Sequence, residues 1–378
     1  MTAPTATAEA PARRGFHPLP VTAVTPAAQD GSAVTVTFHV PERLRETFAF
    51  SPGQYVTVRA RPDGTEVRRP YSVCSPPGAL RADGTLRIGV RTVEGGRFSP
   101  YAARELAAGD ALDVLPPEGR FTTRLDPLRR RRYAALAAGS GITPVLSLVA
   151  AALDTEPAAA FTVLYGNRCA ASAMFTEELA DLKDRYGRRL QLLRLFSRET
   201  HRIGLAGKRP DPETLRTLLA GPLAADLIDE WFLCGPLAMV RGARDLLTER
   251  GVPAAAVHTE LFRAEDDPGD GARTAETAPH PGSSGEGAEV TVRYGGRSTT
   301  LRAEPGQTLL DAALSHHPEL PFSCRNGVCA TCRARVVDGR AEMTRNWTLT
   351  EEERAADYVL TCQATPVTKT VGLDFDVV

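Results

Sequence analysis

Short alternations of apolar and polar residues mark the first third of the chain. Residues 34–38, 55–58 and 86–90 alternate in this way and are rich in β-branched side chains, which is typical of β-strands. Turn-forming residues separate them, as in the Ser-Pro-Gly of residues 51–53. Several short strands at this spacing predict an antiparallel β-barrel over residues 15–126.

The period of the pattern changes between residues 127 and 262. A buried strand over residues 133–138 runs into a glycine turn and a helical stretch that begins at Pro144. Further strands are predicted at residues 161–165, 190–195 and 230–234, and helices at residues 173–186 and 237–250. This alternation predicts a parallel sheet with helices on both faces and with ligands at the carboxyl ends of its strands.

Two segments lack the apolar residues that a core needs. Residues 1–14 are mostly Ala, Pro and Thr, which predicts a disordered leader. Residues 263–287 contain Ala, Gly, Pro, Asp, Glu and Ser without an aliphatic anchor, which predicts a flexible linker.

The last ninety residues form a third unit. A strand over residues 289–294, a hairpin turn at Gly295 and Gly296, and a helix over residues 308–316 predict a small α+β domain of β-grasp-like type over residues 288–378. The fold class is therefore multidomain.

Composition narrows the function classes. The formal net charge of -1 argues against nucleic-acid binding, and no apolar run is long enough to span a bilayer. The N-terminus lacks the apolar core of a signal peptide, and seven cysteines, an odd number, suit a reducing compartment. These features predict a cytoplasmic protein that does not act at a membrane.

Four cysteines carry the most specific chemistry. Cys324, Cys329 and Cys332 have the spacing C-x4-C-x2-C, and Cys362 follows at a distance. This is the plant-type pattern of thiolates that hold a [2Fe-2S] cluster. The alternatives are a zinc site or reduced core thiols, but a structural zinc site usually has a second close Cys or His pair, which is missing here.

Two polar stretches of the predicted barrel could bind a cofactor. Arg69-Pro70-Tyr71-Ser72 offers a guanidinium, an aromatic ring and a hydroxyl, the groups that hold a phosphate and cover a flat ring system, although an ordinary strand with a surface Arg has the same residues. Residues 94–99 place Gly95 and Gly96 before a predicted helix start, so that free backbone N–H groups could face a diphosphate. The alternative is a tight turn with a Ser N-cap.

The parallel-sheet region has the features of a dinucleotide site. Gly139-Ser140-Gly141-Ile142-Thr143-Pro144 follows a strand as in a dinucleotide-binding turn, but it lacks the third Gly of the Rossmann fingerprint. Arg168, Ser197 and Arg198 follow other strands and could grip a ribose 2′-phosphate, which would select NADPH, although each Arg alone is more often a surface residue.

These motifs, in this order, resemble the ferredoxin–NADP reductase superfamily, and the last ninety residues are similar to a plant-type ferredoxin. The combination resembles the reductase components of bacterial multicomponent oxygenases, above all the reductase subunits of ring-1,2-phenylacetyl-CoA epoxidases. The resemblance implies FAD, or FMN as a less favoured alternative, together with NADPH and a [2Fe-2S] cluster. The residues that it places at the flavin are Arg69, Pro70, Tyr71, Ser72, Gly95, Gly96, Arg97, Phe98, Ser99 and Phe121.

The resemblance also implies where hydride transfer occurs. The residues that it places at NADPH are Gly139, Gly141, Thr143, Pro144, Arg168, Ser197, Arg198, Gly235 and Pro236. Cys234 would lie by the nicotinamide, and Glu260 and Phe262 would lie near the flavin ring. The residues that it places at the cluster are Cys324, Cys329, Cys332 and Cys362.

The implied function is electron transfer from NADPH through flavin and cluster to a di-iron oxygenase that epoxidises phenylacetyl-CoA. Alternatives are the reductase of a Rieske ring hydroxylase or of a steroid hydroxylase, or a redox carrier or sensor without turnover. Nothing in the residues themselves reads the substrate. The acidic residues 351–353 could form a docking patch, but a solvated helix face is favoured.

Overall fold

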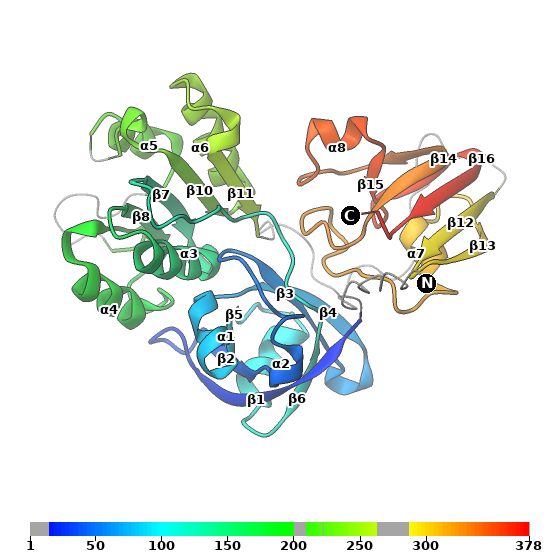
Figure 1. Cartoon of the computed structure of the whole chain (residues 1–378), viewed down its shortest axis with the longest axis horizontal. Helices are drawn as coiled ribbons and strands as arrows, with labels where there is room; N and C mark the ends of the chain where they lie inside the picture. The colour runs from blue at the N-terminus through cyan, green and yellow to red at the C-terminus, as the bar shows by residue number, and fades with distance from the viewer. Residues whose placement is uncertain (1–14, 200–208, 222, 263–286, 378) are drawn as a thin grey trace, which may run out of the picture.

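The computed structural model describes residues 15–199, 209–221, 223–262 and 287–377. The predicted leader and all but the last residue of the predicted linker lie outside these residues. The described chain forms three sheets, each with its own core (Figure 1). We call the three parts the barrel module (β1–β6), the parallel-sheet module (β7–β11) and the C-terminal module (β12–β16). The predicted multidomain fold class is confirmed.

The barrel module is an antiparallel sheet in the order β4-β3-β6-β1-β2-β5. An isolated bridge from Val73, directly after β4, to Ile88 in β5 joins the two outer strands and closes the barrel. Phe38, Phe48 and Val56 are fully buried in its core. Its elements are β1 (His17–Pro26), β2 (Ala33–His39), β3 (Tyr55–Ala60), β4 (Val67–Ser72), α1 (Pro77–Asp83), β5 (Thr85–Arg91), α2 (Phe98–Arg104) and β6 (Ala111–Val114).

The register of β3 and β4 determines which side chains of the barrel module face the other two modules. Tyr55 lies opposite Ser72, and Arg59 lies opposite Arg68. Side chains directly opposite one another in an antiparallel pair share a face. Because Val56 packs into the barrel core, its neighbour Tyr55 belongs to the outer face, together with the other three.

The parallel-sheet module has the order β11-β10-β7-β8-β9, with every pair parallel. Helices α3 and α4 share a core with one face of β7, and α5 and α6 share a core with the other face, as predicted. Helix α4 begins at Thr176, three residues later than predicted, because Phe175 adopts a left-handed φ of 58°. The elements are β7 (Arg132–Ala138), α3 (Ile142–Thr155), β8 (Ala160–Asn167), α4 (Thr176–Tyr186), β9 (Leu190–Phe196), α5 (Pro212–Leu219), β10 (Glu230–Gly235), α6 (Leu237–Glu249) and β11 (Val257–Leu261).

The C-terminal module combines a mixed sheet, in the order β13-β12-β16-β14-β15, with two short helices. The predicted hairpin turn is present, since Gly295 and Gly296 have φ of 61° and 73°. The Thr308 side chain accepts a hydrogen bond from the Asp311 N–H and caps the first helix. The elements are β12 (Ala288–Tyr294), β13 (Arg297–Ala303), α7 (Leu309–Leu314), β14 (Arg333–Met343), α8 (Glu351–Ala355), β15 (Tyr358–Leu360) and β16 (Ala364–Asp374). Within the described ranges, no helix has the length and apolarity to cross a bilayer.

Candidate functional site

The four predicted cluster cysteines converge in the C-terminal module. The thiols of Cys324 and Cys329 are hydrogen-bonded to each other, and so are those of Cys332 and Cys362. A [2Fe-2S] cluster needs four thiolates, two for each iron. The two thiol pairs therefore fit a two-iron cluster. Within the described ranges, no three or more His, Cys, Asp or Glu side chains are gathered closely enough to hold a single metal ion.

Three of these cysteines lie on the loop of residues 324–332, called the cysteine loop below, which is bent by residues with left-handed backbone conformation. Arg325, Gly327 and Ala330 have φ of 54°, 75° and 59°. The hydrogen bond between the two thiols lowers the pKa of Cys324 and raises the pKa of Cys329, so Cys324 is the first of this pair to become a thiolate. Within the described chain the buried hydroxyl of Ser323 has no hydrogen-bond partner, which suits a position beside an acceptor sulfur. The donor set thus fits the cluster.

A second polar cluster joins the barrel and parallel-sheet modules. The Ser72 hydroxyl, at the end of β4, donates a hydrogen bond to Glu260 Oε2 over 2.9 Å. The Cys234 thiol, at the end of β10, lies 3.9 Å from the same oxygen. Glu260 comes from β11, where it is in register with Cys234. Of the three residues that the sequence assigned to flavin and nicotinamide, Ser72 and Cys234 therefore both contact the carboxyl group of Glu260.

Burial changes the titration of this second cluster. It raises the pKa of Glu260 to about 7 and keeps the Cys234 thiol protonated by raising its pKa well above the usual value. Because the folded pKa of Glu260 exceeds the ordinary carboxyl value, proton binding stabilises the folded chain at low pH. That stabilisation is lost as the pH rises through about 7. A carboxyl group that changes charge near neutral pH is suited to a reacting site.

Most residues expected at the flavin lie on β4, in the loop before α2 or in the first turn of α2. The rings of Tyr71 and Phe98 have centroids 5.3 Å apart, so the two motifs meet. Ser99 is not the helix N-cap. Instead its hydroxyl accepts a hydrogen bond from the Val93 N–H and holds the glycine loop. Gly95 has φ of 70° with open space around its Cα, which leaves this loop accessible to a ligand.

Other residues of this group have their own local placement. Arg69 donates from Nη1 to the Arg68 carbonyl, Pro70 lies opposite Thr57 in the strand ladder, and Arg97 and Gly96 lead into α2. Arg69 and Pro70 thus lie on β4 beside Tyr71, and Gly96 and Arg97 lie in the loop before α2.

Phe121 is also expected at the flavin. Its ring is 3% exposed and lies edge-on to Phe232, with centroids 5.5 Å apart. It belongs to the core of the parallel-sheet module, whereas Tyr71 packs against the barrel core. The ring of Phe121 therefore packs between the modules, and its place at the flavin stays a prediction.

The glycine turn after β7 is built for close backbone approach. A Cβ at Gly141 would lie 2.3 Å from the Cys234 carbonyl oxygen, so the turn touches the end of β10. Gly139 has φ of 55°, and Thr143 donates to the Ser140 carbonyl over 2.9 Å. Pro144 occupies the position of the third Gly of the fingerprint and is buried in the first turn of α3.

The segment after β10 continues the same edge. Gly235 has φ of 153°, and a Cβ there would lie 2.8 Å from the Met239 methyl group. Pro236 precedes α6. Phe262 donates its N–H to the Gly235 carbonyl over 3.4 Å, which places it beside Cys234 and Glu260 at the carboxyl edge of the sheet.

The three residues expected at a 2′-phosphate also come together. The Arg198 N–H donates to the Arg168 carbonyl over 2.9 Å, and the Ser197 N–H donates to the Asn167 carbonyl over 3.0 Å. Both arginines are exposed. The backbone pairing that continues past β8 and β9 thus brings Arg168, Ser197 and Arg198 together at one corner of the carboxyl edge.

Tyr55 was not expected at any site, yet it connects the barrel to the cysteine loop. Its hydroxyl donates to the Cys329 carbonyl and lies 2.9 Å from the Thr331 hydroxyl. It also lies 3.0 Å from Glu118 Oε1. The sequence offered no signal for this contact, because the pattern of residues 55–58 predicts only that Tyr55 belongs to a β-strand.

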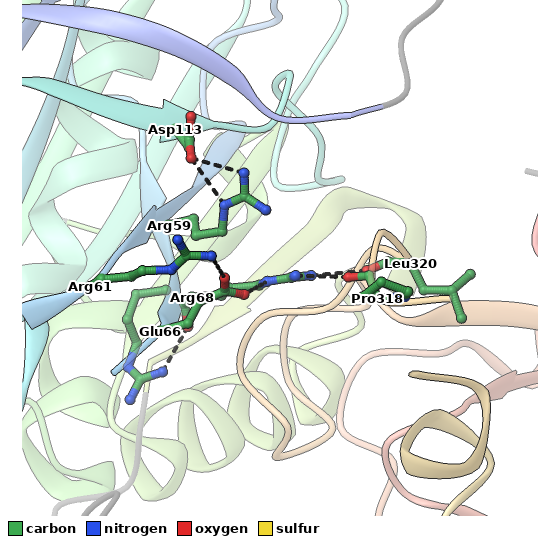
Figure 2. A network of polar contacts seen from close by, with 8 residues as sticks. Arg59, Arg61, Glu66, Arg68, Asp113, Pro318 and Leu320 are labelled. Atoms are coloured by element: carbon green, nitrogen blue, oxygen red, sulfur yellow. Dashed lines mark hydrogen bonds and ion pairs between the residues drawn. The ribbon is translucent and has the colours of Figure 1, made fainter. Parts of the chain in front are cut away.

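Arg68 is the second connection between these modules (Figure 2). Its guanidinium donates to the carbonyls of Leu320 and Pro318 over 3.1 and 2.9 Å and to Glu66 over 3.0 Å. It also lies 4.2 Å from the centroid of the Phe322 ring. Burial of a guanidinium is tolerated where its donors are satisfied, as they are here.

We expect Arg68→Ala to loosen the C-terminal module. Two carbonyls would lose a charged donor. Amide exchange over residues 317–323 should therefore be roughly tenfold or more faster than in the unaltered protein. Arg61→Ala is the matched control, since Arg61 binds the same Glu66 over 3.0 Å but is 69% exposed. Equal exchange in the two variants, measured by hydrogen–deuterium exchange, would contradict this role of Arg68.

The three acidic residues at the start of α8 do not all lie on the solvated face that the sequence favoured. Glu351 and Glu352 are exposed, as predicted for a solvated face. Glu353 instead forms ion pairs with Arg333 and with Arg120 of the barrel module. The solvated-face prediction is therefore wrong for Glu353, because the barrel module approaches this helix. On the same side, Arg241 of α6 lies 4.3 Å from the centroid of the Trp347 ring.

Comparisons with known proteins agree with this arrangement. An oxidoreductase FAD-binding domain model matches residues 22–123, an oxidoreductase NAD-binding domain model matches residues 135–245, and a 2Fe-2S iron-sulfur cluster binding domain model matches residues 292–367. The solved structure of phthalate dioxygenase reductase has a TM-score of 0.57 at 22% identity, covering 96% of this chain and 98% of that one. This likeness shows the shared fold.

Two curated relatives are similar over nearly their whole length. A 1,2-phenylacetyl-CoA epoxidase subunit from Escherichia coli (strain K12) is 43% identical over 96% of this chain and 98% of the relative. The ferredoxin reductase component of 3-ketosteroid-9-alpha-monooxygenase from Rhodococcus rhodochrous is 33% identical over 90% of this chain and 92% of the relative. The chain thus belongs to the family of FAD-, NAD- and [2Fe-2S]-binding oxidoreductases that serve as reductase components of oxygenases.

Proposed function

We propose that this protein carries electrons from NADPH through FAD and a [2Fe-2S] cluster to the di-iron component of a phenylacetyl-CoA epoxidase. The observation that carries the proposal is the directly opposed pair Ser72 and Tyr55. Ser72 contacts the Glu260 and Cys234 cluster, and Tyr55 contacts the cysteine loop. The 43% identity to the epoxidase protein of Escherichia coli supports the choice of acceptor.

The residues divide the work of binding as follows. Arg69 and the loop of Gly95 to Ser99 would hold the flavin phosphates, and Tyr71 would cover the ring. When bound, the flavin links a two-electron hydride donor to a cluster that moves one electron at a time. Phe98 packs in the barrel core against Tyr71, and Pro70 precedes Tyr71 on β4, so both would hold the Tyr71 ring in position.

The hydride site lies at the Ser72–Glu260–Cys234 cluster. Hydride loss leaves a positively charged nicotinamide ring, so an ionised Glu260 would stabilise the product side of the step. Ser72 orients the Glu260 carboxylate through its hydrogen bond. Cys234 keeps its proton and presents a small apolar surface for ring packing. Phe262 closes the edge beside them and would shield the site from water.

Selection of NADPH is assigned to Arg198, with Arg168 and Ser197 beside it. We expect Arg198→Ala to raise the KM for NADPH roughly tenfold to a hundredfold, because a charged hydrogen bond to the 2′-phosphate is lost. The KM for NADH, which lacks that phosphate, should stay unchanged. Arg188→Ala, at the opposite end of β9, is the matched control. Equal effects on both nucleotides in steady-state assays would count against the assignment.

The acceptor is tested by reconstitution. Epoxidation inserts one oxygen atom of O2 and reduces the other to water, so it consumes the two electrons of one NADPH. We expect epoxide formation when the protein is mixed with the oxygenase subunits of a phenylacetyl-CoA epoxidase, phenylacetyl-CoA, NADPH and O2. Faster NADPH oxidation with the oxygenase of a 3-ketosteroid-9-alpha-monooxygenase, the acceptor suggested by the 33% identical relative, would redirect the proposal.

The proposed setting is the cytoplasm, because all seven cysteines are free thiols and four of them must stay available for iron. We assign the flavin site to residues 15–126, the nucleotide site to residues 127–262 and the cluster to residues 288–378. Isolation of stable fragments with these boundaries, each binding its own cofactor, would test the division.

A further inference from the structure

The contact between Tyr55 and the cysteine loop differs from the other contacts between the modules. Arg68 binds Pro318 and Leu320 and Arg120 pairs with Glu353, all outside the cysteine loop. Tyr55 bonds to the carbonyl of a cluster ligand, Cys329, and to Thr331, which stands between two ligands. Tyr55 therefore contacts the segment whose backbone positions the cluster ligands.

The Tyr55 ring is held in place from the barrel side. Its backbone N–H and carbonyl exchange hydrogen bonds of 2.9 Å with those of Glu118. A Cβ at Gly119 would lie 2.9 Å from Tyr55 Cδ1, so the backbone of this segment packs directly on the ring. The side chain is 6% exposed, and Thr331 is 4% exposed. A clamped ring with a buried hydroxyl is a rigid support for the loop that it touches.

The strand register places this support next to the hydride site. Tyr55 is directly opposite Ser72, and residues in such a pair have Cβ atoms roughly 5 Å apart. Ser72 in turn donates to Glu260. In this cross-strand pair, Tyr55 thus contacts the cysteine loop and Ser72 contacts the proposed flavin and nicotinamide site.

We propose that Tyr55 is a positioning residue for electron transfer: its hydroxyl fixes the segment from Cys329 to Thr331 against the barrel, at the distance from the flavin that rapid reduction of the cluster requires. The inference rests on the proposed function. NADPH is oxidised by loss of a hydride, and the cluster is reduced by one electron at a time. Tyr55 neither gains nor loses an electron in this account.

The test uses the full-length protein loaded with both cofactors. In Tyr55→Phe, NADPH should bleach the flavin at the wild-type rate, whereas reduction of the cluster should slow roughly tenfold, because two hydrogen bonds to the loop are lost. Anaerobic stopped-flow absorbance separates the two steps. Tyr186→Phe, which removes a hydroxyl from α4, is the control and should leave both rates unchanged.

Two further readouts do not depend on turnover. Amide exchange over residues 325–333 should rise in Tyr55→Phe, and the electron paramagnetic resonance spectrum of the dithionite-reduced cluster should change, since a ligand carbonyl loses its donor. Thr331→Val should reproduce part of the effect, and the double variant should be less than additive.

The outcomes distinguish this inference from the proposed function. Wild-type cluster reduction, exchange and spectrum in Tyr55→Phe would overturn the role of Tyr55 while leaving the reductase intact. Failure of NADPH to reduce the flavin in the unaltered protein would instead overturn the proposed function itself.

Discussion

Cys332→Ala should abolish electron output from the cluster while sparing reduction of the flavin by NADPH. Cys332 is 3% exposed and paired with Cys362, so its loss removes one of the four thiolates of the site. Even changes behind the ligands of a metal site cost tenfold to a hundredfold in affinity or activity, so loss of a ligand should cost roughly a hundredfold or more.

This result is measured by cluster absorbance, iron content and NADPH-driven reduction of a one-electron acceptor. The matched control is Cys169→Ala, since Cys169 is a partly exposed thiol beside Ser172 and far in sequence from the cysteine loop. The control should keep full iron content. A Cys332→Ala protein with wild-type cluster absorbance would show that the four cysteines are not the ligands.

Glu260→Gln should slow reduction of the flavin by NADPH, by roughly a hundredfold at pH 8. The substitution keeps the size of the side chain and its acceptor for Ser72 but removes the charge that favours the cationic nicotinamide product. The rate in the unaltered protein should rise with pH through about 7, where Glu260 loses its proton, and Glu260→Gln should flatten this profile.

Stopped-flow measurement of flavin bleaching between pH 5.5 and 8.5 would check both statements, because each concerns the hydride step alone. Glu249→Gln, at the exposed end of α6, is the matched control and should retain the pH profile. An unchanged profile in Glu260→Gln would assign the titration to another group.

Local pattern was sufficient for much of the architecture. The spacing of Cys324, Cys329 and Cys332 indicated the cluster because three ligands on one loop depend on neighbouring residues only. The change of hydrophobic period near residue 133 likewise located the parallel sheet, since burial on both faces produces a continuous apolar strand. Strand β11 was missed because it is a short, partly exposed edge strand.

Contacts between the modules could not be predicted in this way. Tyr55 and Thr331 are 276 residues apart, and Arg68 and Leu320 are 252 residues apart, so no local pattern relates them. The same limit explains Phe121, whose ring serves the core between modules. The sequence could name Cys234 and Glu260 only through resemblance. The β10–β11 register and the hydrogen bond from Ser72 were needed to show that both lie beside the predicted flavin stretch.

The central claim is that electrons pass from NADPH to the flavin and then to the cluster within one chain. Anaerobic mixing of the purified protein with NADPH and, separately, NADH tests it most directly. The account predicts loss of flavin absorbance first, then loss of cluster absorbance, with both changes faster for NADPH. A protein that lacks either chromophore, or in which NADPH leaves both unchanged, would contradict it.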